Sequence, residues 1–186
     1  MTGASGYTFS EDWFTPNLPH FRRHLSTLAG TPCRLLEIGA HEGRATTWMA
    51  ETLLGHPEAR LDVIDLFVQR RLRENIARTG RAAQLRVLGG ASRHVLPRLD
   101  AGGYDFVYVD GSHASVDVLE DAVFSFRLTR IGGVIAFDDY LWNDPLASAR
   151  GVPKPAVDAV LAIYAPLIEV LEHGTQVWLR KRAEHA

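Results

Sequence analysis

The feature that most constrains the fold of this chain is an alternation, after residue 30, of short β-branched runs with helical stretches. The runs that predict strands are Arg34–Ile38, Arg60–Asp65, Gln84–Leu88, Tyr104–Asp110 and Ile131–Asp138. The stretches that predict helices are Arg44–Leu54, Val68–Arg78, Ser115–Leu128 and Ala156–Ala165. Most strand runs are continuously apolar, which is typical of parallel strands covered on both faces. The rhythm predicts an α/β protein with a doubly wound, Rossmann-like sheet.

The end of the chain follows a different pattern. Leu167–Leu171 and Gln176–Arg180 are typical of two strands joined by a short turn that contains Gly174. We therefore expect a mostly parallel, seven-stranded sheet with a C-terminal antiparallel hairpin. No repeat or linker interrupts residues 1–186, so we predict a single domain whose residues 1–30 form a lid or an anchor.

One predicted helix carries a pattern that indicates which of its faces is buried. Val116, Leu119, Val123 and Phe126 recur at the spacing of a helical face that packs on a core.

Charge and cysteine content exclude several classes of function. The net charge is −2, and the 20 basic residues are scattered rather than clustered, so we expect no nucleic acid partner. No apolar run approaches the roughly 20 residues that a membrane span needs, and the N-terminus lacks the features of a signal peptide. With Cys33 as the single cysteine, no disulfide within the chain is expected. These features favour a cytoplasmic protein without a membrane partner.

A glycine-containing turn follows the first predicted strand. The segment Glu37-Ile38-Gly39-Ala40-His41-Glu42-Gly43 lies where open α/β sheets bind ligands, at the carboxyl end of a strand. It lacks the middle glycine of the motif that holds a pyrophosphate, which favours a ligand without a diphosphate. The alternative is an ordinary tight turn followed by a helix cap.

The next two strand ends add groups that suit a nucleoside. Asp65 ends the second strand, where a carboxylate accepts hydrogen bonds from ribose hydroxyls. Gly89-Gly90-Ala91-Ser92 follows the third strand with small residues that leave room for an adenine ring. The alternatives are a solvated aspartate and a loop in which Ser92 caps a helix. Together the three strand ends favour a nucleoside ligand.

A second group of polar residues follows the fourth and fifth strands. Asp110 and Asp138 each end a strand, and Asp139 follows, so three carboxylates are expected at one edge of the sheet. Without a cation they would repel one another and raise their pKa values. A hard divalent cation would relieve this repulsion. The alternative is a polar strand end with Asp110 as a helix cap.

Several motifs together resemble the class I S-adenosylmethionine-dependent methyltransferases. They are LLEIGAHEGRATTW, LDVIDLF, YDFVYVDGSH and IGGVIAFDDY, with EDWFTPNLP and VPKPAVDAV near the two ends. The chain is most similar to a small bacterial branch related to catechol O-methyltransferase and to metal-dependent sugar O-methyltransferases. The resemblance implies an enzyme that methylates a small-molecule hydroxyl of the catechol or sugar-diol type, as in natural product biosynthesis.

The resemblance also implies which residues bind the cofactors. Glu37 and Gly39 would lie beside the methionine moiety of S-adenosyl-L-methionine, and Asp65 would accept the ribose. The full set of implied cofactor-binding residues is Glu37, Gly39, Ala40, Gly43, Asp65, Leu66, Gly90, Ala91, Ser92 and Asp110. The implied ligands of a divalent metal, Mg²⁺ first, are Asp110, Asp138 and Asp139. Ala45 departs from the serine that is common in relatives, and Thr46 or the helix N-terminus is the candidate to replace its contact.

His113 is the predicted catalytic residue. It stands three residues after Asp110, at the offset where the catechol enzyme has a lysine base. A histidine titrates near neutral pH and suits a general base, although a metal ligand or a helix cap is an alternative. If no metal is used, His113 would be the sole base. The alternatives of another class are a nicotinamide-dependent oxidoreductase and a non-catalytic nucleoside-binding protein.

Aromatic residues near both sites are candidates for ligand contacts. His41 lies inside the first turn, and Trp13 and Phe14 suit either a lid or an anchor. Tyr140 and Trp142 begin a loop of about fifteen residues, and long loops in compact α/β domains are usually functional. We also expect a homodimer, because the C-terminal hairpin and the aromatic N-terminus offer apolar surface.

Overall fold

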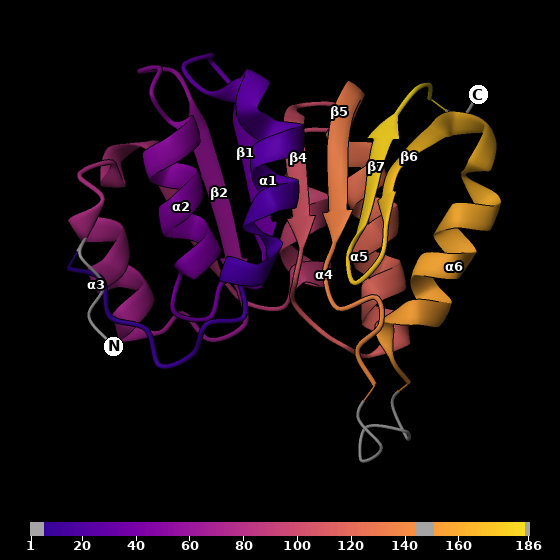
Figure 1. The fold of residues 1–186 in the computed structure, drawn as a ribbon, viewed down its shortest axis with the longest axis horizontal. Helices are drawn as coiled ribbons and strands as arrows, with labels where there is room; N and C mark the ends of the chain where they lie inside the picture. The colour runs from indigo at the N-terminus through magenta and orange to yellow at the C-terminus, as the bar shows by residue number, and fades with distance from the viewer. Residues whose placement is uncertain (1–5, 144–150, 185–186) are drawn as a thin grey trace. The chain divides into compact units, whose positions relative to one another are not determined.

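Three parallel strands form the sheet of the first part of the chain. They are β1 (Arg34–Ile38), β2 (Arg60–Asp65) and β3 (Leu85–Gly89), in the order β3-β2-β1 (Figure 1). The computed structural model describes residues 6–143 and 151–184, which belong to two units, Met1–Gly90 and Ala91–Ala186. In the first unit, β1 and β2 are buried along almost their whole length, as their apolar sequences predict. β3 begins one residue later than predicted, because Gln84 belongs to the 3-10 turn η3 (Ala82–Gln84).

Helices connect these strands and cover them. α2 (Arg44–Leu53) buries Ala45, Met49 and Leu53, which lie one turn apart, and α3 (Arg70–Arg78) buries Leu72 and Ile76. The C-terminal ends of both helices lie within one residue of the predicted ends, and α3 begins two residues later than predicted. The spacing of four residues explains why each helix turns one apolar stripe toward the sheet.

The N-terminal residues form short helical segments on this unit. They are η1 (Thr15–Asn17), α1 (Leu18–Leu25) and η2 (Ser26–Leu28). α1 buries Phe21 and Leu25. Phe14 packs edge-on against Phe21 with 4.8 Å between ring centroids, and both rings contact Trp48 of α2. Phe14 is therefore an anchor of the N-terminal segment.

The second unit contains the other four strands, in the order β4-β5-β7-β6 (Figure 1). β4 (Tyr104–Val109) and β5 (Thr129–Phe137) run parallel, whereas β7 (Val177–Lys181) is antiparallel to both β5 and β6 (Ile168–His173). The predicted C-terminal hairpin is thus present. Its core includes Phe106 of β4, whose ring stacks on Trp178 of β7 at 5.5 Å.

Helices of the second unit are α5 (Ser115–Leu128), which has the predicted bounds, and α6 (Pro153–Ile163), which begins three residues earlier than predicted. The short segments α4 (Ser92–Val95), η4 (Leu96–Arg98) and η5 (Ala165–Leu167) complete the unit. No helix within residues 6–143 and 151–184 is long and apolar enough to cross a membrane.

The predicted buried face of α5 was wrong in its first turn, although Phe126 is buried as predicted. Val116 is 68% exposed and Leu119 is 39% exposed, whereas Val118, Ala122 and Phe126 are buried. Both sets have helical spacing, and the polar residues Asp121 and Ser125 lie on the buried side with the second set. Because Asp121 and Ser125 lie within it, the buried stripe does not stand out as apolar in the sequence.

Candidate functional site

The turn between β1 and α2 has the tight geometry that its two glycines allow. Gly39 and Gly43 have φ angles of 86° and 84°, in the left-handed region that glycine adopts most readily. The N–H of Gly39 donates to the carbonyl of Ile64 on β2 at 2.8 Å. A Cβ atom at Gly43 would lie 2.6 Å from Cδ1 of Leu72 on α3, so a larger residue there would force this side chain to move. The backbone of this turn is therefore fixed by β2 on one side and α3 on the other.

Glu37 is buried at the end of β1, directly below this turn. Its side chain is 1% exposed and accepts a hydrogen bond from the hydroxyl of Thr46 on α2. Burial raises the pKa of Glu37 to about 8, and the nearby charge of Asp65 adds to this effect. The Thr46 hydroxyl thus donates its hydrogen to Glu37 and cannot donate it to a cofactor carboxylate at the same time. This contact disfavours Thr46 as the replacement for the serine contact.

Asp65 lies at the end of β2 and faces the same turn. Its Oδ2 atom accepts hydrogen bonds from the N–H groups of Ala40 and His41, each at 2.9 Å, and Oδ1 accepts one from Phe67 at 2.8 Å. Leu66 and Phe67 beside it are 59% and 76% exposed. Asp65 therefore orders the turn and stands next to an exposed apolar surface.

The end of β3 lies beside Asp65, as predicted. Gly89 is the register partner of Asp65, and the N–H of Gly90 donates to the Asp65 carbonyl at 3.0 Å. The first unit thus brings together the turn, Glu37, Asp65 and the end of β3. This grouping follows from the parallel arrangement, because the carboxyl ends of neighbouring parallel strands share one edge of a sheet.

Ser92 and Asp121 form a buried contact in the second unit. Ala91 is the N-cap of α4 and Ser92 is its first residue, so the alternative that Ser92 caps this helix was wrong. The Ser92 hydroxyl instead hydrogen-bonds the carboxylate of Asp121 on α5. Asp121 is 2% exposed, and burial raises its pKa to about 6. Nothing in the sequence pattern around Asp121 indicated this contact.

The residues of the predicted metal site line one small pocket of the second unit. The N–H of Asp138 donates to the carbonyl of Val109 at 3.0 Å, so the ends of β4 and β5 lie side by side. The residues around the pocket are Val109, Asp110, Gly111, Ser112, His113, Val118, Phe137, Asp138, Asp139 and Pro153. Asp110, His113, Asp138 and Asp139 are therefore neighbours, as their strand positions predicted.

Two of these carboxylates are engaged by neighbouring side chains. Asp138 accepts a hydrogen bond from the hydroxyl of Tyr108, and its own Oδ1 accepts the N–H of Asp139 at 2.8 Å. Burial and the charge of Asp139 raise the pKa of Asp138, against the hydrogen bond from Tyr108. Asp139 has a φ of 54°, which is uncommon for a residue other than glycine. Such conformations concentrate at functional sites.

His113 contacts Asp139 and an aromatic ring. Its Nε2 atom lies 2.9 Å from Oδ2 of Asp139, and this hydrogen bond raises the pKa of His113. The imidazole also packs on Trp142 with 4.3 Å between ring centroids. His113 is thus oriented by a carboxylate on one side and an indole on the other.

The described residues 6–143 and 151–184 contain no group of three or more His, Cys, Asp or Glu side chains arranged to hold a metal ion. The carboxylates of the pocket do offer the oxygen donors that Mg²⁺ prefers. Asp138 and Asp139 also hydrogen-bond Tyr108 and His113, so a cation bound there would share these carboxylates with those partners. The donor chemistry thus suits a hard cation, whereas the side-chain positions are those of a hydrogen-bonded pocket.

Tyr140 supports the start of the loop that follows Asp139. It is 4% exposed, and its hydroxyl donates to Asp158 of α6 at 2.7 Å while accepting a hydrogen bond from Lys154. The rest of the predicted loop includes residues 144–150, which lie outside the described residues.

Comparisons with known proteins point to one family. A family model described as a methyltransferase domain matches residues 36–140. A catechol O-methyltransferase from Mycobacterium tuberculosis is 31% identical over 111 residues, which are 58% of this chain and 48% of that protein. A catechol O-methyltransferase from Niastella koreensis is 27% identical over 158 residues, 82% of this chain and 69% of that protein. The chain thus spans about half the length of the first of these relatives.

Solved structures share the fold at low sequence identity. TomG, an O-methyltransferase from Streptomyces achromogenes solved with S-adenosylmethionine, has a TM-score of 0.71 and 21% identity, covering 94% of this chain and 82% of its own. MycE, solved with Mg, S-adenosylhomocysteine and mycinamycin VI, has a TM-score of 0.64 and 19% identity, covering 94% of this chain and 51% of its own. The predicted Rossmann-like α/β fold, with its seven strands and C-terminal hairpin, is confirmed.

Proposed function

This chain belongs to the methyltransferase domain family, whose model matches more than half of it, and we propose that it is an S-adenosyl-L-methionine-dependent O-methyltransferase. The observation that carries the proposal is the group formed by the glycine turn, Glu37 and Asp65 at one edge of the first unit. The relatives named catechol O-methyltransferase support the same reaction type.

The proposed cofactor contacts follow the strand ends of the first unit. The methionine moiety would lie along the turn at Gly39, Ala40 and Gly43, with Glu37 below it. Asp65 would accept the ribose hydroxyls, and Leu66 and Gly90 would lie beside it. The exposed apolar surface at Leu66 suits an adenine ring, which buries apolar area when it binds. Ala91, Ser92 and Asp110 belong to the second unit, and their contacts with the cofactor stay predictions from the resemblance.

Asp65→Ala tests this assignment. The variant is expected to weaken the binding of S-adenosylhomocysteine by about 1.5–3 kcal/mol, which is the scale for a lost hydrogen bond to a charged group. Isothermal titration calorimetry measures the change. Asp62→Asn is the matched control, because Asp62 lies on the same strand and pairs with Arg86 at 2.7 Å, away from the turn. An Asp65→Ala variant with wild-type affinity would overturn the ribose assignment.

We propose Asp110, Asp138 and Asp139 as the ligands of a divalent cation, Mg²⁺ before Ca²⁺. The support is the oxygen donor set and the raised pKa of Asp138, whose repulsion with Asp139 a cation would relieve. The bound cation supplies positive charge that lowers the pKa of a hydroxyl group beside it. The presence of Mg in the MycE structure agrees with this choice.

The proposed acceptor is a small molecule with two neighbouring hydroxyl groups, such as a catechol or a sugar diol, as found in natural products. His113 would take the proton from the hydroxyl that is methylated. Its contact with Asp139 fixes the orientation of the imidazole, which is what a general base requires. A screen of catechols and sugar diols with labelled cofactor tests the acceptor class.

The contact between His113 and Asp139 also supports a second candidate, which is methyl transfer without a metal. In that case His113 is the sole base and Asp139 orients it and stabilises its protonated form, as a carboxylate does for a catalytic histidine. A titration with chelator separates the two candidates, because only the first loses activity.

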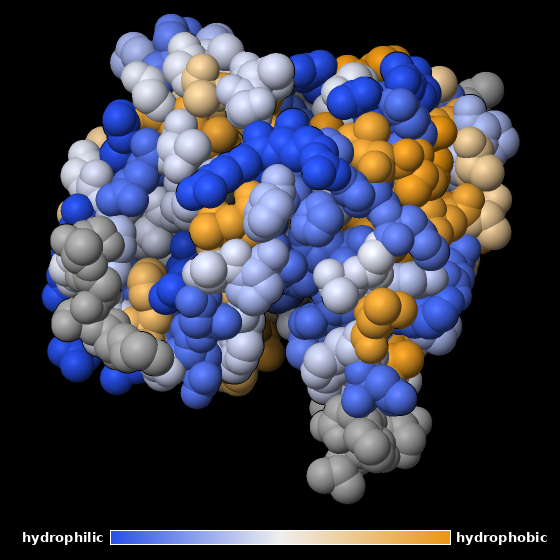
Figure 2. Space-filling model, viewed as in Figure 1, coloured by the Kyte–Doolittle hydropathy of each residue, from blue (hydrophilic) through white to orange (hydrophobic). Residues whose placement is uncertain are grey.

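We propose a homodimer formed through the C-terminal hairpin and nearby surface. Hydrophobic residues gather over the part of the second unit where Figure 1 draws β6, β7 and α6 (Figure 2). Ile163 of α6 and Val170 of β6 are 70% and 48% exposed. Light scattering at micromolar concentration is expected to give twice the monomer mass of 20.6 kDa. A monomer mass across the concentration range would rule the dimer out.

A further inference from the structure

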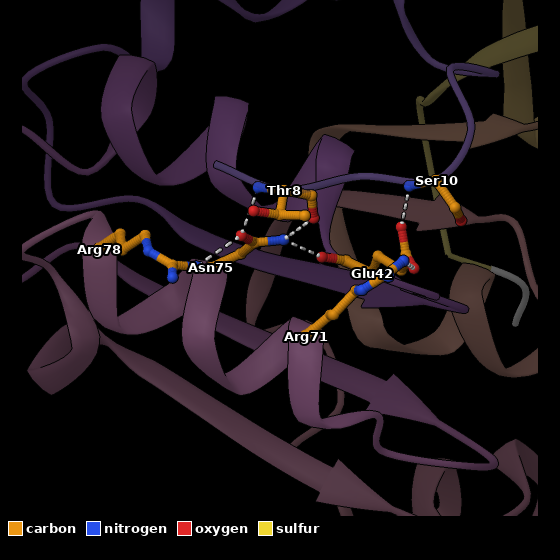
Figure 3. Close-up of polar contacts among 6 residues, drawn as sticks. All are labelled: Thr8, Ser10, Glu42, Arg71, Asn75 and Arg78. Atoms are coloured by element: carbon orange, nitrogen blue, oxygen red, sulfur yellow. Dashed lines mark hydrogen bonds and ion pairs between the residues drawn. The ribbon is translucent and has the colours of Figure 1, made fainter. Parts of the chain in front are cut away.

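The N-terminal strap, which we define as residues 7–15, is fastened to the first unit by a buried asparagine (Figure 3). Asn75 of α3 is fully buried. Its Oδ1 accepts the N–H of Thr8 at 3.1 Å, and its Nδ2 donates to the carbonyl of Thr8 at 2.9 Å. The same Nδ2 donates to the carbonyl of Glu42 at 2.8 Å. One side chain therefore joins the strap, the glycine turn and α3.

Glu42 makes a second link between the strap and the turn. Its side chain lies inside the turn between Gly39 and Gly43 and is 5% exposed. One carboxylate oxygen accepts the N–H of Ser10 at 2.5 Å, and the other pairs with Arg71 of α3 at 2.5 Å. These contacts lower the pKa of Glu42 and so keep it charged, although burial opposes them. In Figure 3 the carboxylate points at the strap.

The strap contacts the first unit at more points than an anchor at its end would need. Phe14 already holds the end of the strap through its contacts with Phe21 and Trp48. Burying Glu42 and Asn75 costs free energy unless their polar atoms are paired, and here the strap backbone provides partners. Further along, Asp12 pairs with Arg44 at the start of α2 at 2.5 Å. The strap is thus fixed along its course across residues 41–44.

The path of the strap determines where Trp13 lies. Its side chain is 67% exposed, yet its ring lies 5.2 Å from that of His41 in the glycine turn. The strap thus places a large aromatic ring in solvent beside the glycine turn. An indole face attracts cations, and S-adenosylmethionine carries a positive sulfonium that its demethylated product lacks.

We infer that Glu42 and Asn75 are positioning residues that hold the strap across the glycine turn, so that Trp13 forms a wall of the cofactor site at its sulfonium end. This inference rests on the proposed function. It assigns to Trp13 the selection of the charged cofactor over the neutral product. It assigns to Glu42 and Asn75 the task of keeping Trp13 in place.

Two measurements test the inference. Cleavage at the exposed Glu11 by a glutamate-specific protease reports whether the strap is docked, and calorimetry gives the dissociation constants for S-adenosylmethionine and S-adenosylhomocysteine. Asn75→Ala and Glu42→Ala are expected to speed cleavage and to weaken S-adenosylmethionine binding at least tenfold. Glu74→Gln is the matched control, because Glu74 is the neighbour of Asn75 on α3 and pairs with Arg70 on the same helix.

Trp13→Ala keeps the inference testable if a buried variant fails to fold, because Trp13 is exposed. It is expected to weaken S-adenosylmethionine binding at least threefold more than S-adenosylhomocysteine binding, with cleavage at Glu11 unchanged. Trp13→Phe, which keeps an aromatic face, is expected to restore most of the difference. Equal losses for both ligands, or none, would overturn the role of Trp13. Fast cleavage in Asn75→Ala with wild-type affinity would overturn the role of the strap. A wild-type protein that binds neither ligand would overturn the proposed function itself, and this inference with it.

Discussion

Asp138→Asn is expected to lower kcat by about a hundredfold or more while leaving the dissociation constant of S-adenosylhomocysteine within about twofold of the wild type. The asparagine keeps one oxygen, which can accept the N–H of Asp139, and its amide nitrogen takes the place of the oxygen that accepts the Tyr108 hydroxyl. It loses the negative charge that a divalent cation requires. Steady-state kinetics with an active acceptor and calorimetry without one give the two quantities.

Tyr108→Phe is the control for this variant. It removes the same hydrogen bond to Asp138 but leaves the carboxylate charged, so it is expected to lower kcat by less than about tenfold. A chelator is expected to abolish wild-type turnover, and Mg²⁺ to restore it. If wild-type turnover survives the chelator, the metal proposal is wrong and His113 is the base without it. His113→Ala would then abolish activity.

Glu37→Gln is expected to remove one cause of pH-dependent stability. The wild type should become less stable as the pH rises because of Glu37, and the variant should lack this contribution. Burial raises the pKa of Glu37 in the folded protein from 4.5 to about 8. Between these values the folded protein holds a proton that the unfolded chain has lost, so the free energy of unfolding falls as pH rises. Glutamine does not titrate. Relative to wild type, the variant should therefore gain up to about 1.4 kcal/mol for each pH unit across this window.

Urea unfolding at several pH values between 5 and 8 measures this difference. Glu58→Gln, which changes an exposed glutamate of the same unit, is the control and should follow the wild-type profile. A constant difference between Glu37→Gln and wild type over the whole range would contradict the assignment of a proton to Glu37.

The strand positions were predictable because the buried strands are continuous apolar runs in the sequence. β1 and β2 have the predicted bounds, and the parallel pairing then places Asp65 next to Gly89 and Asp138 next to Val109. The same logic, that parallel strands end at one edge, predicted which residues of each site would be neighbours. Local pattern and topology agree at these positions.

Side-chain partners were not predictable in the same way. Tyr108 was expected only as a strand residue, because an apolar run gives no sign that one hydroxyl in it meets a carboxylate. The buried face of α5 was mistaken because Asp121 and Ser125 lie among its core residues. Glu42 and Asn75 are polar residues in a turn and a helix, where solvent exposure is the usual expectation. Their burial depends on the path of the N-terminal segment, which no local pattern specifies.

The way in which Asn75 holds Thr8 has a consequence for how this protein tolerates sequence change. Asn75 hydrogen-bonds the main chain at that position, whereas Glu42 accepts hydrogen bonds from both the main-chain N–H and the hydroxyl of Ser10. The side chain at position 8 can therefore change without loss of the two hydrogen bonds that Asn75 makes there. The restriction falls instead on position 75, because a side chain of another length cannot accept from the N–H of Thr8 and donate to its carbonyl while reaching the carbonyl of Glu42. Mutational tolerance is thus divided unequally between the two partners of the same contact.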